Sequence, residues 1–298
     1  MKKIHFSKYF PYLLILPSIL LLAVFCFYPM IRGLSYAFLD YQRNKPQQYG
    51  FIGLDNFVAL FTSDKKAMQS LVVSLKWVAA EVALQLVFGL IFALILNKKF
   101  RGRGAARTIC FAPWAVSGVL TTMLWLLIYN DNIGFLNGIL DMIGMGHLKR
   151  AWLSGLQTVF PSVVIAELWR GIPFFAINIL AALQNISNDL YESAKVDGAT
   201  KPQILFKITL PFLKESIIFA TLMRCIWEFQ SVDMIMTMTD GGPINLTTTF
   251  PIYMYKKAIV EGNYGYGAAL GILSFVILSV FAFAYLKMND FGKGINEE

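Results

Sequence analysis

Charged side chains set inside apolar segments are the residues of this sequence with the clearest capacity for chemistry. Glu167 and Arg170 stand three residues apart and Arg224 and Glu228 stand four apart, so each pair shares one face of a helix. A charge in apolar surroundings is costly unless it pairs with another charge or faces a water-filled path. Each pair can therefore neutralise itself and hold helices together, or it can offer hydrogen bonds to a hydrophilic molecule, and both roles can hold at once.

Other kinds of chemistry find no support in the sequence. Its two histidines, His5 and His147, are near no plausible serine, cysteine or carboxylate partner in the sequence, so no catalytic triad or zinc site is predicted. Cys26, Cys110 and Cys225 are scattered in apolar runs and make neither a disulfide framework nor a metal-ligand spacing. The Gly-x-x-x-x-Gly-Lys-Ser/Thr pattern that cradles nucleotide phosphates does not occur. We expect no catalytic residue, no bound metal and no cofactor on this chain.

The composition indicates a protein that crosses a membrane several times. Of the 298 residues, 57% are hydrophobic and only 15% are charged, which is too apolar for a soluble globule of this length. A helix needs about 20 apolar residues to cross a ~30 Å hydrocarbon core. We therefore predict an all-α polytopic membrane protein with a single domain over residues 1–298. Its six transmembrane segments are expected at about 11–34, 70–97, 106–129, 156–182, 212–236 and 265–286.

The basic residues predict how these segments are oriented. The first apolar run follows Lys2, Lys3 and Lys8 and has no small-x-small cleavage site, so it is expected to be an uncleaved span with the N-terminus inside. Residues 98–103 hold four basic residues in six, and such loops stay in the cytoplasm. Both termini, residues 98–107 and the segment between the fourth and fifth spans are then cytoplasmic. The formal charge of +8 suits anionic lipid headgroups, and no nucleic-acid partner is expected.

The segment between the fourth and fifth apolar runs is polar and is predicted to form a helical hairpin. Asp189 and Glu192 have the spacing of a capping box, which begins a short helix. Gly198 suits the left-handed conformation that ends such a helix. Thr200 and Gln203 have the spacing of a second capping box, which starts the next helix. The predicted hairpin therefore has an exposed tip.

Three motifs follow one another along the chain. Residues 51–57 read Phe-Ile-Gly-Leu-Asp-Asn-Phe, residues 192–211 hold Glu-Ser-Ala…Asp-Gly-Ala…Leu-Pro, and residues 241–255 hold Gly-Gly-Pro…Thr…Tyr. These motifs resemble, in the same order, those of bacterial ABC importer permeases of the carbohydrate-uptake group, which includes the maltose and glycerol-phosphate types. The one departure noted in the central motif is Ser193, where the family pattern usually has alanine.

The resemblance implies a fold, a location and partners. The fold would be that of a type I ABC importer permease with six transmembrane helices, in a multi-pass protein of the bacterial inner membrane that is not itself an enzyme. The implied partners are a second permease subunit that makes a heterodimer, two ATPase subunits that hold ATP and Mg, and an extracytoplasmic substrate-binding protein. The hairpin, residues 189–211, would contact the ATPase through Glu192, Ser193, Ala194, Asp197, Gly198 and Ala199.

The resemblance also implies that the cargo is a sugar or oligosaccharide, whose identity the sequence does not specify. Sugar recognition requires hydrogen-bonding groups and aromatic faces. The candidate substrate path therefore consists of polar and aromatic residues at depth in the fourth and fifth spans, namely Glu167, Trp169, Arg170, Asn178, Arg224, Trp227 and Glu228.

Two alternative functions remain open at this stage. The same machine can carry glycerol phosphate or another polar cargo, and Arg170 and Arg224 are the inner cations that would favour it. A different class is an ion-coupled secondary transporter, in which Glu81, Glu167 and Glu228 would relay protons. Such a carrier leaves the hairpin without an explanation.

Overall fold

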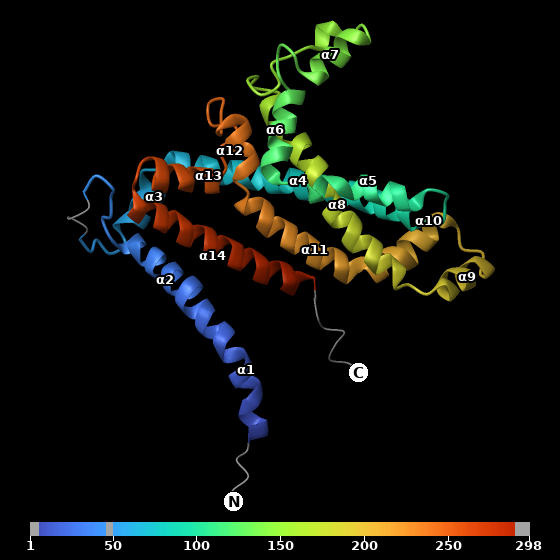
Figure 1. Cartoon of the computed structure of the whole chain (residues 1–298), viewed down its shortest axis with the longest axis horizontal. Helices are drawn as coiled ribbons and strands as arrows, with labels where there is room; N and C mark the ends of the chain where they lie inside the picture. Colours follow the sequence, from blue (N-terminus) through green and yellow to red (C-terminus); the bar gives the residue numbers. More distant parts are fainter. Residues whose placement is uncertain (1–5, 46–49, 290–298) are drawn as a thin grey trace, which may run out of the picture. The chain divides into compact units, whose positions relative to one another are not determined.

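The computed structural model describes residues 6–45 and 50–289, and this part of the chain is built from helices (Figure 1). Within these residues the β-structure is limited to two isolated bridges, Leu39 with Phe51 and Gln42 with Asn263. The predicted all-α fold class is confirmed. Lys2, Lys3, His5 and the C-terminal residues, on which part of the orientation prediction rests, lie outside the described residues.

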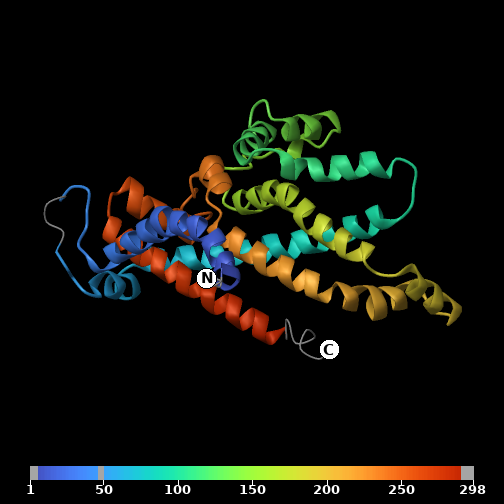
Figure 2. The same cartoon turned by 60° about the horizontal axis from the view of Figure 1, so that its bottom comes forward.

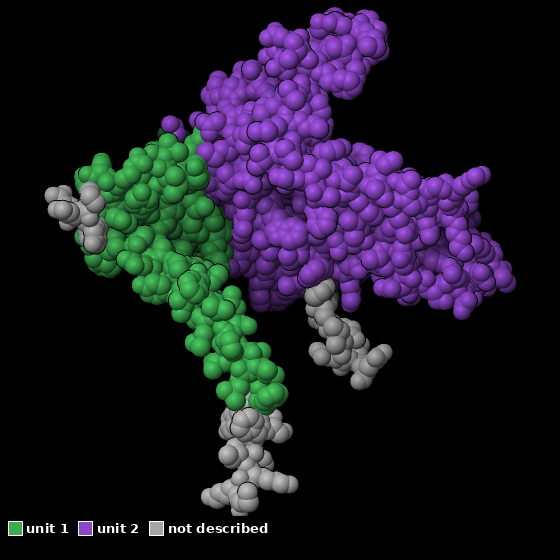
Figure 3. Space-filling view, viewed as in Figure 1, with its two compact units in different colours: residues 1–65, 254–277 green, residues 66–253, 278–298 purple. Residues whose placement is uncertain are grey.

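The chain divides into two compact units, which Figure 3 colours separately. Unit 1 comprises residues 1–65 and 254–277, and unit 2 comprises residues 66–253 and 278–298. Unit 1 begins with an almost unbroken helical segment, whose apolar side chains between residues 10 and 31 are exposed. Its helical elements are α1 (Phe6–Leu22), a π-helical segment (Ala23–Phe27), α2 (Tyr28–Ser35), a 3-10 turn (Tyr36–Phe38), α3 (Asp55–Thr62), a second π-helical segment (Lys256–Val260) and the first part of α14 (Tyr264–Met288).

Unit 2 holds the residues that matter most for function. Its helices are α4 (Lys65–Asn97), α5 (Arg103–Ala115), α6 (Gly118–Ile128), α7 (Phe135–Met142), α8 (Val159–Gln184), α9 (Asn188–Val196), α10 (Lys201–Ile204), α11 (Leu210–Gln230), α12 (Asp233–Thr239) and α13 (Phe250–Tyr255). A 3-10 turn (Gly146–Leu148) and a π-helical segment (Leu205–Thr209) complete the list. α8 packs against α5 and α11, and α9 and α10 stand at one end of α11 (Figures 1 and 2).

Four helical segments in the described part are long and apolar enough to cross a membrane: residues 10–38, α4, α8 and α14. α5 and α6 together make a fifth candidate, but the pair is bent by 98°. α11 is 21 residues long and carries Lys214, Glu215, Arg224 and Glu228, so it does not belong to the strongly apolar set. The count of six spans stays a prediction.

Two of the predicted spans are not continuous helices. The range 106–129 is broken at Val116 and Ser117, whose extended backbone separates α5 from α6. Pro113 lacks an N–H donor, which weakens the last turn of α5 just before the break. The range 212–236 is interrupted after Gln230, where α11 ends and α12 starts at Asp233. Apolar run length alone does not report such breaks, because extended residues can be as apolar as helical ones.

Two hydrophobic cores stabilise unit 2. One gathers Trp77, Val163 and Ile235 with neighbours from α4, α6, α8 and α12. The other gathers Phe175, Ile179 and Leu213 with neighbours from α4, α5, α8 and α11. The helix α8 takes part in both, so its buried residues hold the polar groups of α4, α8 and α11 at fixed distances.

Candidate functional site

A cluster of seven side chains from three helices lies in unit 2, and we call it the polar cluster. It consists of Trp77, Glu81 and Gln85 from α4, Glu167 and Arg170 from α8, and Arg224 and Glu228 from α11. Six of these residues are buried, and the Arg170 side chain keeps 29% of its surface exposed. The sequence already pointed to the four charged residues of α8 and α11.

The two arginines of the polar cluster bind the carboxylates of Glu167 and Glu228. Arg170 donates from Nε to Glu167 Oε2 at 3.0 Å and from Nη2 to Glu167 Oε1 at 2.8 Å. Arg224 Nη2 lies 3.1 Å from Glu167 Oε1 and 2.7 Å from Glu228 Oε1. Charge-assisted bonds of this kind are stronger than neutral ones. Arg224 therefore joins α8 to α11, in addition to its pairing along α11.

Gln85 brings α4 into the same network. Its Nε2 donates to Glu81 Oε2 at 2.9 Å and to Glu228 Oε1 at 3.0 Å, while its Oε1 accepts from Arg224 Nε at 2.6 Å. Trp77 Nε1 donates to Glu228 Oε2 at 3.1 Å. Both amide N–H groups and the amide oxygen of Gln85 are thus engaged, which fixes the orientation of its side chain.

Gly171 lies on α8 at a point where the side chains of the polar cluster leave no space for a Cβ atom. A Cβ atom added there would lie 2.3 Å from Gln85 Nε2 and 2.5 Å from Arg224 Nη2, distances that real Cβ atoms do not tolerate. A side chain at this position would therefore displace the ends of Gln85 and Arg224 from their hydrogen-bond partners. No sequence motif indicated this role for Gly171.

Aromatic rings with exposed surface adjoin the polar cluster. Trp227 packs edge-on against Phe174 with 5.1 Å between ring centroids, and the Arg224 guanidinium lies 5.9 Å from the centroid of the same ring. Trp227 is 43% exposed and Trp169 is 37% exposed. Asn178 donates to the carbonyl of Phe174 at 2.7 Å, so its amide is engaged within its own helix.

The structure brings four of the seven candidate path residues into one cluster, namely Glu167, Arg170, Arg224 and Glu228. Sequence reasoning paired them within each helix and missed the contact between Arg224 and Glu167, which are 57 residues apart. It also missed Trp77 as a partner of Glu228, 151 residues away. Spacing along one helix reveals partners in that helix and says nothing about partners from another helix.

The hairpin, residues 189–211, carries exposed acidic groups. Glu192 and Asp197 are exposed, and Val196 between them is 88% exposed, whereas Ala194 is buried. A hollow of about 380 Å³ is lined by Asp189, Glu192, Ser193, Val196 and Asp197. The Tyr191 hydroxyl lies 3.4 Å from Thr209 Oγ1, which links α9 to the π-helical segment that leads into α11.

The backbone of the hairpin reverses at Gly198, as predicted. Gly198 has φ +78°, and the N–H of Ala199 donates to the carbonyl of Ala194 at 2.9 Å, which closes the end of α9. The second predicted cap is also observed, because Gln203 Oε1 accepts from the N–H of Thr200 at 2.7 Å. The second helix of the hairpin begins where the sequence predicted.

The first predicted cap was wrong by two residues. Ser187, not Asp189, is the N-cap of α9, and its hydroxyl accepts from the N–H of Asp189 at 3.2 Å. Ser187 has extended backbone angles that aim its oxygen at the first turn. Asp189 lies within that turn, where the partial positive charge of the helix N-terminus favours a carboxylate.

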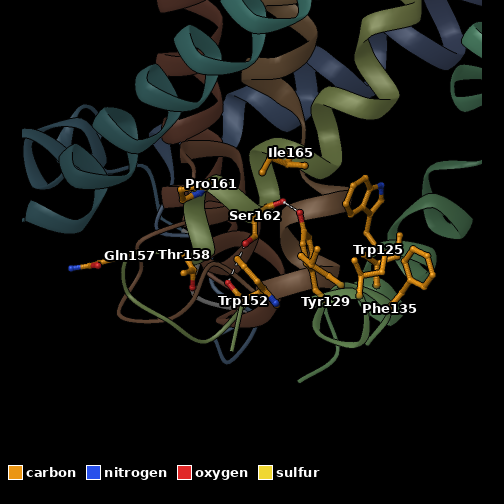
Figure 4. A pocket seen from close by; sticks show the side chains of 12 residues that line it. Trp125, Tyr129, Phe135, Trp152, Gln157, Thr158, Pro161, Ser162 and Ile165 are labelled. Atoms are coloured by element: carbon orange, nitrogen blue, oxygen red, sulfur yellow. Dashed lines mark hydrogen bonds between the residues drawn. The ribbon is translucent and has the colours of Figure 1, made fainter. Parts of the chain in front are cut away.

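A third feature is an aromatic cavity of about 500 Å³ between α6, α7 and α8 (Figure 4). Trp125, Tyr129, Phe135 and Trp152 are among its lining residues. The polar ends of two of these rings are already engaged, because Tyr129 Oη donates to the carbonyl of Ser162 at 3.0 Å and Trp152 Nε1 donates to Asn137 Oδ1 at 2.8 Å. The cavity therefore offers mainly apolar surface.

Helices that are long and apolar enough to span a membrane, with buried polar groups between them, are typical of an integral membrane protein. Among the described residues, no group of three or more His, Cys, Asp or Glu side chains has the geometry of a metal site.

Comparison with known proteins identifies the family. Residues 85–291 match the family described as binding-protein-dependent transport system inner membrane component, and this chain belongs to that family. The chain is 35% identical to the trehalose/maltose transport system permease protein MalF of Thermococcus litoralis, over 94% of this chain and 93% of the relative.

Two solved structures agree with this assignment. A bacterial ABC transporter involved in the import of the acidic polysaccharide alginate matches with a TM-score of 0.84 and 26% identity, over 95% of this chain and 96% of that chain. A bacterial alginate ABC transporter in complex with an alginate pentasaccharide-bound periplasmic protein matches with a TM-score of 0.82, over 98% of this chain and 96% of that chain.

These findings settle the class of the protein. The type I importer permease fold and the ABC permease class are confirmed, and the chain is a membrane subunit of a transport system, not an enzyme. Its family is one of inner-membrane components. The comparisons give no support to the ion-coupled secondary transporter.

Proposed function

We propose that this chain is one membrane-spanning subunit of an ABC importer for a sugar or oligosaccharide. The observation that carries the proposal is the 35% identity, over nearly the whole chain, to a relative named for trehalose/maltose transport, together with two structural matches to a polysaccharide importer. The test is to purify the cognate binding protein, measure its affinity for a panel of sugars, and measure uptake of the bound sugars by cells with and without this chain. Uptake that does not depend on this chain would contradict the proposal.

The working assembly contains four other protein subunits. We infer a second permease that forms a heterodimer with this chain, two ATPase subunits that hold ATP and Mg, and an extracytoplasmic binding protein that delivers the cargo. Closure of the ATPases would move the hairpin and tilt the attached helices between inward-facing and outward-facing states. Purification of the complex through a tag on this chain should recover the other permease and the ATPase in a one-to-one-to-two ratio.

The orientation follows from the same assembly. Both termini, residues 98–107 and residues 184–211 are proposed to lie in the cytoplasm, where the ATPase is. The supporting observation is the four basic residues in 98–103. Reporter fusions after residues 103 and 188 test it, and an extracytoplasmic reporter at either position would contradict it.

The hairpin is the proposed contact with the ATPase, through Glu192, Ser193, Ala194, Asp197, Gly198 and Ala199. In support, exposed acidic groups surround a hollow of about 380 Å³ with the exposed Val196 beside them. A partner with basic groups and an apolar recess would complement this surface. The contact between Tyr191 and Thr209 gives the hairpin a connection to α11 through which movement can pass.

Charge reversal at Glu192 tests the proposed contact with the ATPase. Glu192→Lys should abolish stimulation of ATPase activity by the loaded binding protein, whereas Glu192→Gln should retain part of it. Asp131→Lys is the matched control, because Asp131 is also exposed but lies in a loop expected on the opposite side of the membrane. Wild-type stimulation in Glu192→Lys would exclude this residue from the contact.

The substrate path is proposed to use the exposed members of the candidate set. Trp169, Arg170 and Trp227 retain accessible surface, and Asn178 is partly exposed. The more deeply buried Glu167, Arg224 and Glu228 would hold this surface in place. Trp227→Ala should raise the KM for uptake while Trp227→Phe restores it, because an aromatic face is what a sugar ring needs. Trp114→Ala, at an exposed tryptophan of α5, is the control.

A phosphorylated cargo is less well supported than a neutral sugar. The two cations that would favour it, Arg170 and Arg224, already bind Glu167 and Glu228 at 2.7–3.1 Å. A phosphate would have to displace these carboxylates. If glycerol phosphate inhibits uptake at the same concentrations at which a neutral sugar does, the phosphorylated cargo becomes the better supported one.

A further inference from the structure

One carboxyl group of the polar cluster differs from the other two. Glu167 and Glu228 each accept from an arginine, as described above. Glu81 is 0% exposed, and its Oε2 accepts from Gln85 Nε2 at 2.9 Å. Its Oε1 is buried and has no hydrogen-bond partner within the part of the chain that the structure describes. If Glu81 were ionised, one of the two oxygens that share its negative charge would have no hydrogen-bond donor.

The formal charges of the polar cluster do not balance if every acid is ionised. Three glutamates face two arginines, which leaves one negative charge in excess. The charged groups that interact electrostatically with Glu81 are Glu228 and Arg224 of α11 and Glu167 of α8, and Gln85 on its own helix is its hydrogen-bond donor. Lys76, the nearby lysine of α4, is exposed. An excess charge in a low-dielectric interior is strongly unfavourable, and gaining a proton is the usual way to remove it.

The bonding of Gln85 identifies which acid carries the extra proton. Gln85 donates one amide N–H to Glu81 and the other to Glu228, and its oxygen accepts from Arg224. Glu228 also accepts from Trp77 and lies 2.7 Å from Arg224 Nη2, so its negative charge is well compensated. Glu167 receives both arginines. Glu81 alone among the three has no cationic donor in the described structure.

We propose that Glu81 binds a proton in the assembled transporter, so that the polar cluster consists of two carboxylates, two guanidinium groups and one neutral carboxylic acid. The proton comes from bulk water as the helices pack, and an O–H bond forms on Oε1. An unpartnered neutral oxygen is less costly in an apolar interior than an unpartnered anionic one. The proton balances the charge of the cluster.

Three matched substitutions test the proposal in the transporter purified with its partner subunits: Glu81→Gln, Glu167→Gln and Glu228→Gln. Glutamine has the shape and the neutrality of a protonated glutamate. Glu81→Gln should therefore retain the wild-type yield of the complex and its melting temperature. Glu167→Gln and Glu228→Gln should lower both, because each leaves an arginine with a weaker acceptor.

Infrared spectroscopy reports the protonation state of the carboxyl group itself, whereas yield and melting temperature report assembly. The wild-type complex should show the carbonyl stretch of a buried neutral carboxylic acid, and Glu81→Gln should lack it. The proposal is overturned if the wild type has no such band, if the band persists undiminished in Glu81→Gln, or if Glu81→Gln lowers the yield as much as Glu228→Gln does. None of these readouts depends on which cargo the importer carries, so they are independent of the proposed function.

Discussion

The polar cluster and the hairpin use charge in opposite ways. In the polar cluster, Glu167 and Glu228 are almost completely buried and each binds an arginine. In the hairpin, Glu192 and Asp197 lie at the surface around a hollow. Breaking a buried pair costs about 3–5 kcal/mol, whereas an exposed pair contributes about 0–1 kcal/mol. Substitutions in the polar cluster should therefore affect folding, and those in the hairpin should affect contact with another protein.

The same contrast holds for the two glycines on which these regions depend. Gly171 is needed because side chains of the polar cluster occupy the space where a Cβ would stand. Gly198 has open space around it, and is needed because its φ of +78° is unfavourable for other residues. One position is constrained by packing and the other by backbone conformation, so the two respond to different substitutions.

The largest expected effect is at Arg224, which joins α8 to α11. Arg224→Ala should destabilise the folded subunit by about 3–5 kcal/mol, because it leaves the buried carboxylate of Glu228 without a cation and leaves Glu167 with Arg170 alone. The measurement is the yield and melting temperature of the purified complex. Lys214→Ala is the control, since Lys214 is an exposed cation on the same helix. Normal assembly of Arg224→Ala with loss of uptake would instead indicate that Arg224 contacts the cargo.

Gly171→Ala should have the next largest effect. Its added methyl group would collide with Gln85 and Arg224, and overpacking of this kind costs about 1–3 kcal/mol. Gly104→Ala is the matched control, because a Cβ at Gly104 meets nothing within 4 Å. Equal melting temperatures for the two variants would mean that the cluster can rearrange around a side chain, which weakens its contrast with the hairpin.

Gly198→Val tests the backbone constraint of the hairpin. A β-branched residue in the left-handed conformation should cost about 1–2 kcal/mol locally. We expect loss of ATPase stimulation by the loaded binding protein, with near-normal insertion of the spans. Gly198→Asn should be milder, because asparagine tolerates this conformation better. Full stimulation in Gly198→Val would show that the reversal at Gly198 is not needed for coupling.

A region was predictable from the sequence when its interacting residues lie close together along the chain. In the hairpin, Gly198 and the pair Thr200 and Gln203 were predicted because their partners lie within a few residues. The cap at Ser187 was missed because the Asp189 and Glu192 spacing offered a competing start. The long helices were predicted from apolar runs, whereas the short helices α3, α7 and α13 and the breaks at 116–117 and 231–232 were not, because apolar run length does not report them.

The charged residues of the polar cluster were visible in the sequence, but most of their contacts were not. Glu81, Glu167, Arg170, Arg224 and Glu228 stood out because they lie within apolar runs, and the last four form two pairs at helical spacing. The pairings of Arg224 with Gln85 and of Trp77 with Glu228 join residues 139 and 151 positions apart, and no local pattern encodes them. The same is true of Gly171, whose role follows from what two other helices place against it. These features depend on tertiary packing, which spacing along one chain segment does not specify.

The smallest expected effect is at the N-cap of the hairpin, and it separates local conformation from coupling. Ser187→Ala removes the hydroxyl that accepts from the N–H of Asp189 at 3.2 Å, and loss of such a cap costs about 1 kcal/mol. Hydrogen exchange of α9 should become faster. Ser193→Ala is the control, because Ser193 is exposed on the same helix. If Ser187→Ala speeds exchange and leaves ATPase stimulation intact, the ATPase itself must order α9 on binding. If ATPase stimulation falls together with the protection of α9 from hydrogen exchange, the hairpin must be ordered before the ATPase binds in order to transmit movement. The polar cluster differs in this respect, because its order comes from its own buried contacts.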